Sequence, residues 1–249
     1  MRKKSSWLIF SATFFILLTV FSSAFAQAFS FSFFAGYNHS QLINLKNATR
    51  IYESKFWAYN IPVSAIDNFP PYLFVEPRVN WRFSQNSRFG LHFLYTSTGS
   101  RVRYFDYSGE LKQDQVVELY APGVSWEYLS ISFYHMELWI VFDCSYLYSK
   151  YDASTFFRLE DEQEFSHENY SAKGFALEPG MQLTYPYGRF LFHFRMDYRF
   201  AHSSRLSTRK NGKTEYFILN DSPVPIQWGG WLWGIGIGFR LGTVSHDAP

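Results

Sequence analysis

The stretch LFVEPRVNWRF, residues 73–83, alternates between two kinds of side chain. Its odd positions are all apolar, whereas its even positions after Phe74 are Glu76, Arg78, Asn80 and Arg82. Because successive side chains of a β-strand point to opposite faces, this segment has one apolar and one charged face. A tilted strand of about 11 residues crosses an apolar band of about 25 Å. The stretch therefore predicts a strand that crosses a membrane.

The same alternation recurs along the chain. The segments lie at about 29–37, 89–96, 120–128, 136–148, 177–185, 190–200 and 231–240. Together with residues 73–83 they make eight strands, an even number, as in single-chain bacterial barrels. We predict an all-β fold, an eight-stranded antiparallel up-and-down transmembrane β-barrel. A ten-stranded barrel stays open.

Aromatic residues decide which face of these strands meets lipid. They make up 22% of the chain, with 28 Phe, 18 Tyr and 8 Trp. A soluble barrel of the lipocalin type would place the apolar face inside. Eight strands enclose a lumen just wide enough for side chains, so this many rings cannot fit there. We therefore expect the rings outside and the charged face in the lumen.

The charged face mixes acidic and basic side chains in comparable numbers and also has two histidines. Buried charges persist only when they are paired and hydrogen-bonded, so we expect a salt-bridged plug that closes the barrel. The expected lumen residues are Glu76, Arg78, Arg82, His92, Glu127, Glu137, Asp143, Glu178, His193, Arg195, Asp197 and Arg199.

Three of the strands share a proline at the same place in the pattern, Pro77, Pro122 and Pro179. Each begins a motif in which apolar residues follow at every second position. Since proline cannot donate a hydrogen bond to a neighbouring strand, its recurrence predicts a shared bulge or a position without pairing.

The connections between the strands alternate in length. Short turns are expected at 84–88, around 131–135 and at 186–189. Longer polar segments at about 38–71, 105–115, 149–173 and 202–226 are expected to be loops. In outer-membrane barrels the long loops are extracellular, so both chain ends would lie on the periplasmic side.

The N-terminus resembles a cleaved signal peptide. Arg2, Lys3 and Lys4 precede the apolar stretch 7–21, and Ala24-Phe25-Ala26 offers small residues for cleavage before Gln27. The apolar stretch is shorter than the roughly 20 residues that a spanning helix needs. We predict a signal peptide at 1–26 and a barrel at 27–249. An uncleaved membrane anchor is the alternative.

Charge and cysteine content exclude several classes of function. Removing residues 1–26 takes away three basic side chains and changes the formal net charge from +2 to −1. No basic excess is left for a nucleic-acid partner. Cys144 is the single cysteine, which excludes an intrachain disulfide and a zinc cluster of cysteines. We expect Cys144 on the membrane face, and we assign no cofactor, metal or catalytic residue.

Taken together, the signal peptide, the eight alternating strands and the loop asymmetry resemble the small outer-membrane barrels of the OmpA/OmpX/OmpW type. The resemblance covers residues of about 27–242 and concerns architecture. Gly234, Ile237 and Phe239 also resemble the signal read by the barrel-assembly machinery, which the resemblance implies as a partner during biogenesis. Two features depart from that signal: Leu232 replaces a polar residue, and ten residues follow Phe239.

The resemblance implies localisation in the bacterial outer membrane, with lipids including lipopolysaccharide as partners. The expected function is a structural or surface-binding role, with an extracellular ligand for the loops as one option. Arg205, Arg209, Lys210 and Lys213 in the fourth loop could meet anionic lipid headgroups. A narrow pore for small or hydrophobic solutes is one alternative.

The other alternative is an enzyme that acts on lipid A or peptides, with members drawn from His193, Asp197, Asp143 or Glu137. His193 and Asp197 share a face but lie about 13 Å apart along a strand, too far for direct contact. We therefore expect no enzyme activity.

Overall fold

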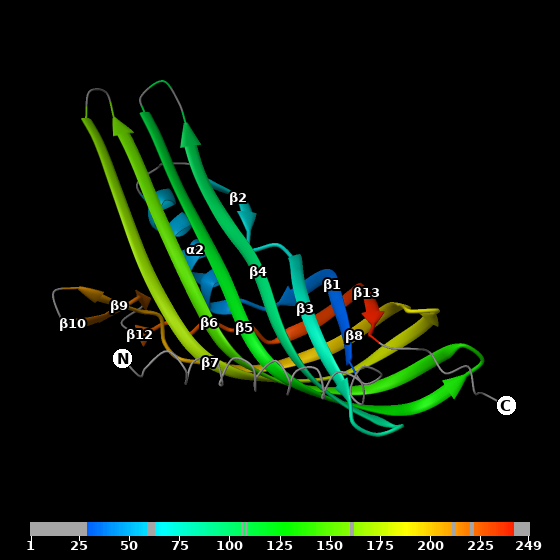
Figure 1. Ribbon diagram of the computed structural model, residues 1–249. Helices are drawn as coiled ribbons and strands as arrows, with labels where there is room; N and C mark the ends of the chain where they lie inside the picture. The colour runs from blue at the N-terminus through cyan, green and yellow to red at the C-terminus, as the bar shows by residue number, and fades with distance from the viewer. Residues whose placement is uncertain are drawn as a thin grey trace, which may run out of the picture.

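The computed structural model describes residues 29–58, 63–105, 107, 109–159, 162–210, 213–219 and 222–241. These residues contain a closed ring of eight antiparallel strands (Figure 1). In ring order the strands are β1 (Phe29–Ser40), β3 (Tyr72–Arg82), β4 (Ser87–Phe105), β5 (Gly109–Phe133), β6 (Met136–Leu159), β7 (Glu162–Tyr187), β8 (Phe190–Ser203) and β13 (Gly230–Arg240). The last strand, β13, pairs with β1 and closes the ring. The predicted eight-stranded barrel is confirmed. The predicted signal peptide at 1–26 lies outside the described residues.

Three short connections join the strands at one end of the barrel. They are residues 83–86, Tyr134–His135 and Gly188–Arg189. Gly188 has a φ of 60°, the left-handed conformation that glycine adopts without steric cost. The opposite end carries α2 (Ile43–Ala58), β2 (Ser64–Asn68), β9 (Ser207–Lys210), β10 (Lys213–Tyr216), β11 (Ile218–Leu219) and β12 (Ser222–Pro223). Among the described residues, no helix is long and apolar enough to cross a membrane.

The three repeated prolines interrupt the hydrogen-bonded ladders, as predicted. The pairing of β3 with β4 skips Pro77, that of β5 with β6 skips Pro122, and that of β7 with β8 skips Pro179. In each case the strand pairs normally on its other side, for example Pro77 with Phe33. The missing donor of proline is a sufficient physical reason.

Two of the segments predicted as loops are strands. Residues 105–115 and 149–173 belong almost entirely to β4, β5, β6 and β7, which continue as a tall wall beyond the rest of the barrel (Figure 1). β5 has 25 residues and β7 has 26, against about 11 for one membrane crossing. The loop prediction was wrong because it took the end of the apolar outward face as the end of the strand.

Inside the wall the alternation continues with its sense partly reversed. The change occurs at a row of neighbouring outward-facing rings, Tyr95, Tyr120 and Tyr148, whose centroids lie 5.2 and 6.3 Å apart. On one side of this row the outward positions are apolar and exposed, such as Trp126 at 45%. On the other side the inward positions are buried, and they mix apolar side chains such as Val117 at 0% with polar ones such as Ser100 and Gln115. The long strands therefore lose their apolar outward face at this row and gain a partly apolar inward face.

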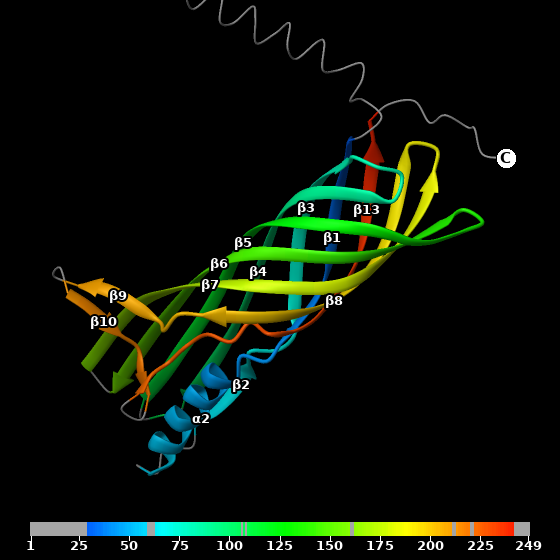
Figure 2. The same ribbon diagram turned by 90° about the horizontal axis from the view of Figure 1, so that it is seen from below.

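Beyond this row the strands enclose an apolar core above the charged lumen. The helix α2 lies against the inner side of the wall (Figure 2). Its side chains Leu45 and Ala48 belong to the same buried cluster as Val117 of β5. The segment after β8 adds Trp228, which is fully buried and donates a hydrogen bond from its indole nitrogen to Ser149 Oγ at 2.7 Å. Apolar burial thus holds this end of the molecule together in the manner of a water-soluble domain.

Candidate functional site

The barrel lumen on the other side of the tyrosine row is filled with ionisable side chains. Eleven of them are buried, and they come from the six consecutive strands β3 to β8. They are Glu76, Arg78, Arg88, His92, Glu127, Asp143, Glu178, His193, Arg195, Asp197 and Arg199. Strands β1 and β13 contribute mainly serines and glycines, together with Phe34, whose ring centroid lies 5.8 Å from the Arg78 guanidinium carbon. The Phe34 ring takes the space beside Gly236, and Ser32 and His193 take the space beside Gly238.

Arg78 lies at the centre of this cluster. Its guanidinium group donates hydrogen bonds to Glu76 at 2.6 Å, to Glu127 at 2.9 Å and to Asp143 at 2.5 Å. Arg195 contacts two of the same carboxylates, Glu76 at 3.1 Å and Asp143 at 2.6 Å. Two guanidinium groups thus bridge two carboxylates across the barrel, an arrangement that compensates for the loss of water around buried charges.

The remaining arginines extend the cluster along the barrel axis. Arg88 is paired with Glu127, and its guanidinium carbon lies 3.9 Å from the centroid of the Trp139 ring. At the other end Arg199 donates to Glu178 at 3.1 Å. Arg88 was not among the expected lumen residues, because residues 84–88 were expected to form a turn. Its even position, in phase with His92 on the same strand, was the signal that could have identified it.

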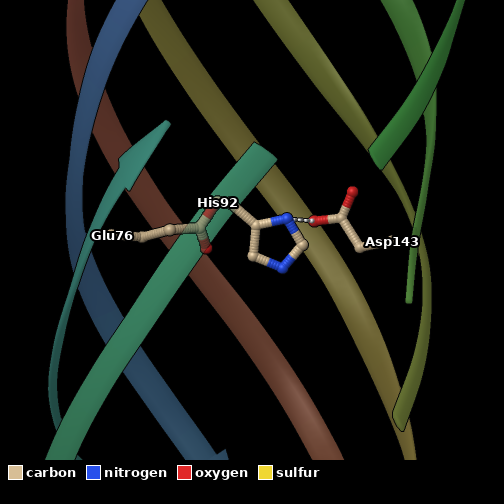
Figure 3. A group of neighbouring side chains, drawn as sticks. All are labelled: Glu76, His92 and Asp143. Carbon is tan, nitrogen blue, oxygen red and sulfur yellow. Dashed lines mark ion pairs between the residues drawn. The ribbon is translucent and has the colours of Figure 1, made fainter. Parts of the chain in front are cut away.

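His92, Ser145 and Asp143 are arranged in the order of a catalytic triad. His92 Nε2 lies 3.0 Å from Ser145 Oγ. On the other side of the ring, Nδ1 lies 3.7 Å from Asp143 Oδ2 (Figure 3). However, the Ser145 hydroxyl donates its single proton to Glu178 at 3.1 Å. Nε2 of His92 must then be the donor toward Ser145, so His92 cannot accept the proton that activates a serine nucleophile. The arrangement is a hydrogen-bonded chain between lumen residues.

His193 belongs to a separate polar group. Its ring nitrogens lie 3.1 Å from Ser32 Oγ and 3.0 Å from Thr184 Oγ1. Asp197 instead accepts a hydrogen bond from Arg195 at 2.5 Å. The lumen therefore gives His193 and Asp197 different partners, in keeping with their spacing along the strand. Glu137 and Arg82, also expected in the lumen, are only half-buried near the short turns.

Glu76, His92 and Asp143 also have the composition of a metal site. One ligand atom from each lies within 4.8 Å of the others (Figure 3). Both carboxylates, however, already accept hydrogen bonds from Arg78 and Arg195. A divalent cation here would sit against two guanidinium charges in a site with little water. The guanidinium groups of Arg78 and Arg195 thus supply the positive charge that a metal ion would bring to these carboxylates.

The fold and the lumen define a class: an antiparallel eight-stranded barrel with a charged interior and exposed aromatic side chains outside. A scan against protein-family models finds no match, and neither does a search of curated proteins. The chain is similar to two solved structures, among others. One is the crystal structure of Ail, the attachment invasion locus protein of Yersinia pestis, with 14% identity, a TM-score of 0.40, and coverage of 86% of this chain and 99% of that one. The other is the outer membrane protein OprG from Pseudomonas aeruginosa, with 11% identity, a TM-score of 0.40, and coverage of 86% and 96%.

Proposed function

We propose that this chain is an outer-membrane β-barrel whose lumen is closed and whose role is structural or surface-binding. The observation that carries the membrane assignment is the outer face below the tyrosine row. Phe31, Trp126, Phe192 and Ile237, on four different strands, are each 45–51% exposed. An apolar surface that continues around a whole barrel is stable only in lipid, and tyrosine rows are typical of its boundary with water.

Closure of the lumen is supported by the cluster around Arg78. Arg78, Glu127 and Asp143 come from three strands and are at most 2% exposed, and Arg78 contacts both carboxylates. Side chains that meet in this way across a narrow barrel leave no continuous water-filled path. Planar-bilayer recordings test this proposal. We expect the purified barrel to give no stepwise conductance, whereas discrete channel openings would favour a narrow pore.

A surface-binding role is supported by the wall that β4 to β7 form above the membrane boundary. Its inner side is covered by α2 and by the segment around Trp228, so it is a rigid platform and not a set of free loops. We expect this platform to be extracellular, because the three short turns lie at the opposite end and would face the periplasm. Outer-membrane lipids, including lipopolysaccharide, are proposed partners, as is the barrel-assembly machinery during biogenesis.

Membrane insertion is tested by fractionation and gel mobility. We expect the protein in the outer-membrane fraction and a shift in SDS-gel migration after boiling, because a hydrogen-bonded closed barrel resists SDS until heated. A protein that carbonate extracts, with migration unaffected by heat, would overturn the proposal.

A role without catalysis is supported by the proton that Ser145 gives to Glu178. Mass spectrometry of lipid A from cells that overproduce the protein tests this. A changed lipid A that reverts with Ser145→Ala would favour an enzyme instead.

A further inference from the structure

A polar pocket lies on the outside of the wall, directly above the tyrosine row. It has a volume of about 490 Å³ and lies between the outer face of β6 and β7 and the hairpin β9–β10. The hairpin continues the sheet at the edge of β7, where Ser171 pairs with Ser207, and projects away from the body of the barrel (Figure 2). The volume lies within the range of small-molecule sites.

The height of the pocket relative to the membrane follows from the strand register. Tyr148, the last ring of the tyrosine row, forms its lower edge. Lys150 is the next outward residue on β6, and its ammonium nitrogen lies 5.5 Å from the centroid of the Tyr120 ring. The pocket thus begins where the apolar surface ends, at the level that lipid headgroups occupy if the barrel is inserted as proposed.

The lining has the chemistry of a site for phosphorylated sugars. Lys150 and Arg209 provide exposed cations on opposite sides of the pocket, one on the wall and one on the hairpin. Hydroxyl groups of Ser171 and Thr214 and the amide of Asn169 line the space between them. Guanidinium and ammonium groups bind phosphate oxygens, and hydroxyls and amides pair with sugar hydroxyls.

The charge around the pocket also favours an anion. Asp152 is the acidic residue of the lining, where it can accept hydrogen bonds from sugar hydroxyls. Besides the two lining cations, Lys173 stands opposite Tyr148 in the register, and Lys210 pairs with Lys213 on the hairpin. The neighbouring acids are Asp152, Glu118 opposite Lys150, and Glu215 opposite Thr208. The five cations outnumber these three acids, and a cationic surface attracts anionic lipids.

We propose that this pocket binds the phosphorylated sugar headgroup of a glycolipid in the leaflet that surrounds the wall. The inference rests on the proposed membrane insertion and adds to it a defined lipid site. Lys150 and Arg209 hold the phosphate from two sides, while Tyr148 contacts the headgroup at the boundary with the acyl chains. The hairpin β9–β10 serves as the outer wall of the site.

The test compares two glycolipids that differ only in phosphate. The folded barrel in uncharged detergent is titrated with lipid A and with the same lipid after enzymatic dephosphorylation, and binding is followed by native mass spectrometry. We expect the phosphorylated lipid to bind at least about tenfold more tightly, with affinity that falls as salt rises. The variant Lys150→Gln/Arg209→Gln should lose most of this difference. The matched control is Arg50→Gln/Arg189→Gln, which removes two exposed cations elsewhere and should keep it.

The outcomes separate this site from the rest of the proposal. Heat-modifiable migration of every sample reports on the barrel itself. An intact barrel that binds both lipids equally, or that loses binding equally in both double variants, overturns the site and leaves the barrel standing. Displacement of lipid A by an equal concentration of glucose 1-phosphate would show a site for soluble sugar phosphates and overturn the lipid assignment.

Discussion

Replacing Arg78 by methionine tests whether the lumen is held by charge balance. The buried cluster has five carboxylates, Glu76, Glu127, Asp143, Glu178 and Asp197, and four guanidinium groups, Arg78, Arg88, Arg195 and Arg199. Counted by formal charge, the carboxylates outnumber the guanidinium groups by one. Loss of Arg78 leaves five carboxylates with three guanidinium groups.

The size of the effect follows from the contacts that remain. Breaking a buried ion pair by removing one partner costs about 3–5 kcal/mol. After Arg78→Met, Glu76 and Asp143 still contact Arg195, and Glu127 still contacts Arg88. Because no carboxylate loses its last cation, we expect a loss in the free energy of unfolding near the lower end of that range, about 3 kcal/mol.

The matched variant Asp143→Asn should have a much smaller effect. It removes the excess negative charge, and its amide oxygen can still accept hydrogen bonds from Arg78 and Arg195. We expect a loss of about 1 kcal/mol or less. In the double variant the charges return to an excess of one, so its loss should be smaller than the sum of the two single losses by about 1–2 kcal/mol.

The measurement is equilibrium urea unfolding of the barrel in phospholipid vesicles, followed by tryptophan fluorescence. If Arg78→Met and Asp143→Asn destabilise the barrel equally, charge balance does not control the lumen. Simple additivity in the double variant would contradict the coupling between Arg78 and Asp143 in the same way.

Three further predictions concern the outer surface and the upper core. Cys144 is exposed on the face that we assign to lipid, so a membrane-impermeant maleimide should modify it in denaturant but not in vesicles. As a control, Ser154→Cys in a Cys144→Ser background should react under both conditions. Rapid labelling of Cys144 in vesicles would contradict the membrane assignment. Trp228→Ala removes a fully buried indole and should lower the free energy of unfolding by about 3–5 kcal/mol. Limited proteolysis of this variant should then cleave α2 before the barrel strands. If α2 stays as protected as in the parent protein, the packing of Trp228 does not hold this end together. At Asp114, burial favours a higher pKa, but hydrogen bonds from Arg101 and Lys112 outweigh it and hold the pKa below its usual value. The small stability from this half-buried group should be present above about pH 4 and be lost as the pH falls through the lowered pKa. Carboxyl NMR titration should show Arg101→Gln raising the pKa of Asp114, and an unchanged value would refute the assignment.

The barrel was predictable because its pattern is local. In a segment such as residues 73–83, each side chain is assigned to a face by its position alone, and the excess of rings over lumen space decides which face meets lipid. The upper wall was not predictable from the same rule. Residues 111–119 still alternate, but the inward side chains of Val117 and Leu119 are buried only because α2 and the segment around Trp228 pack in the same core. Both of these segments lie more than 50 residues away in sequence, one on either side.

The alternation of side chains along the chain was enough to predict the class of fold, the orientation of the strands' apolar faces, and most of the residues in the lumen. Which charges meet depends on how the strands pack in three dimensions. Arg78 and Asp143 are 65 residues apart, and their 2.5 Å contact exists because strand tilt and register bring β3 and β6 to the same level across the barrel. This packing also decides where strands end and where a pocket forms, since both depend on pairing between distant segments, which a period of two residues along one strand does not encode.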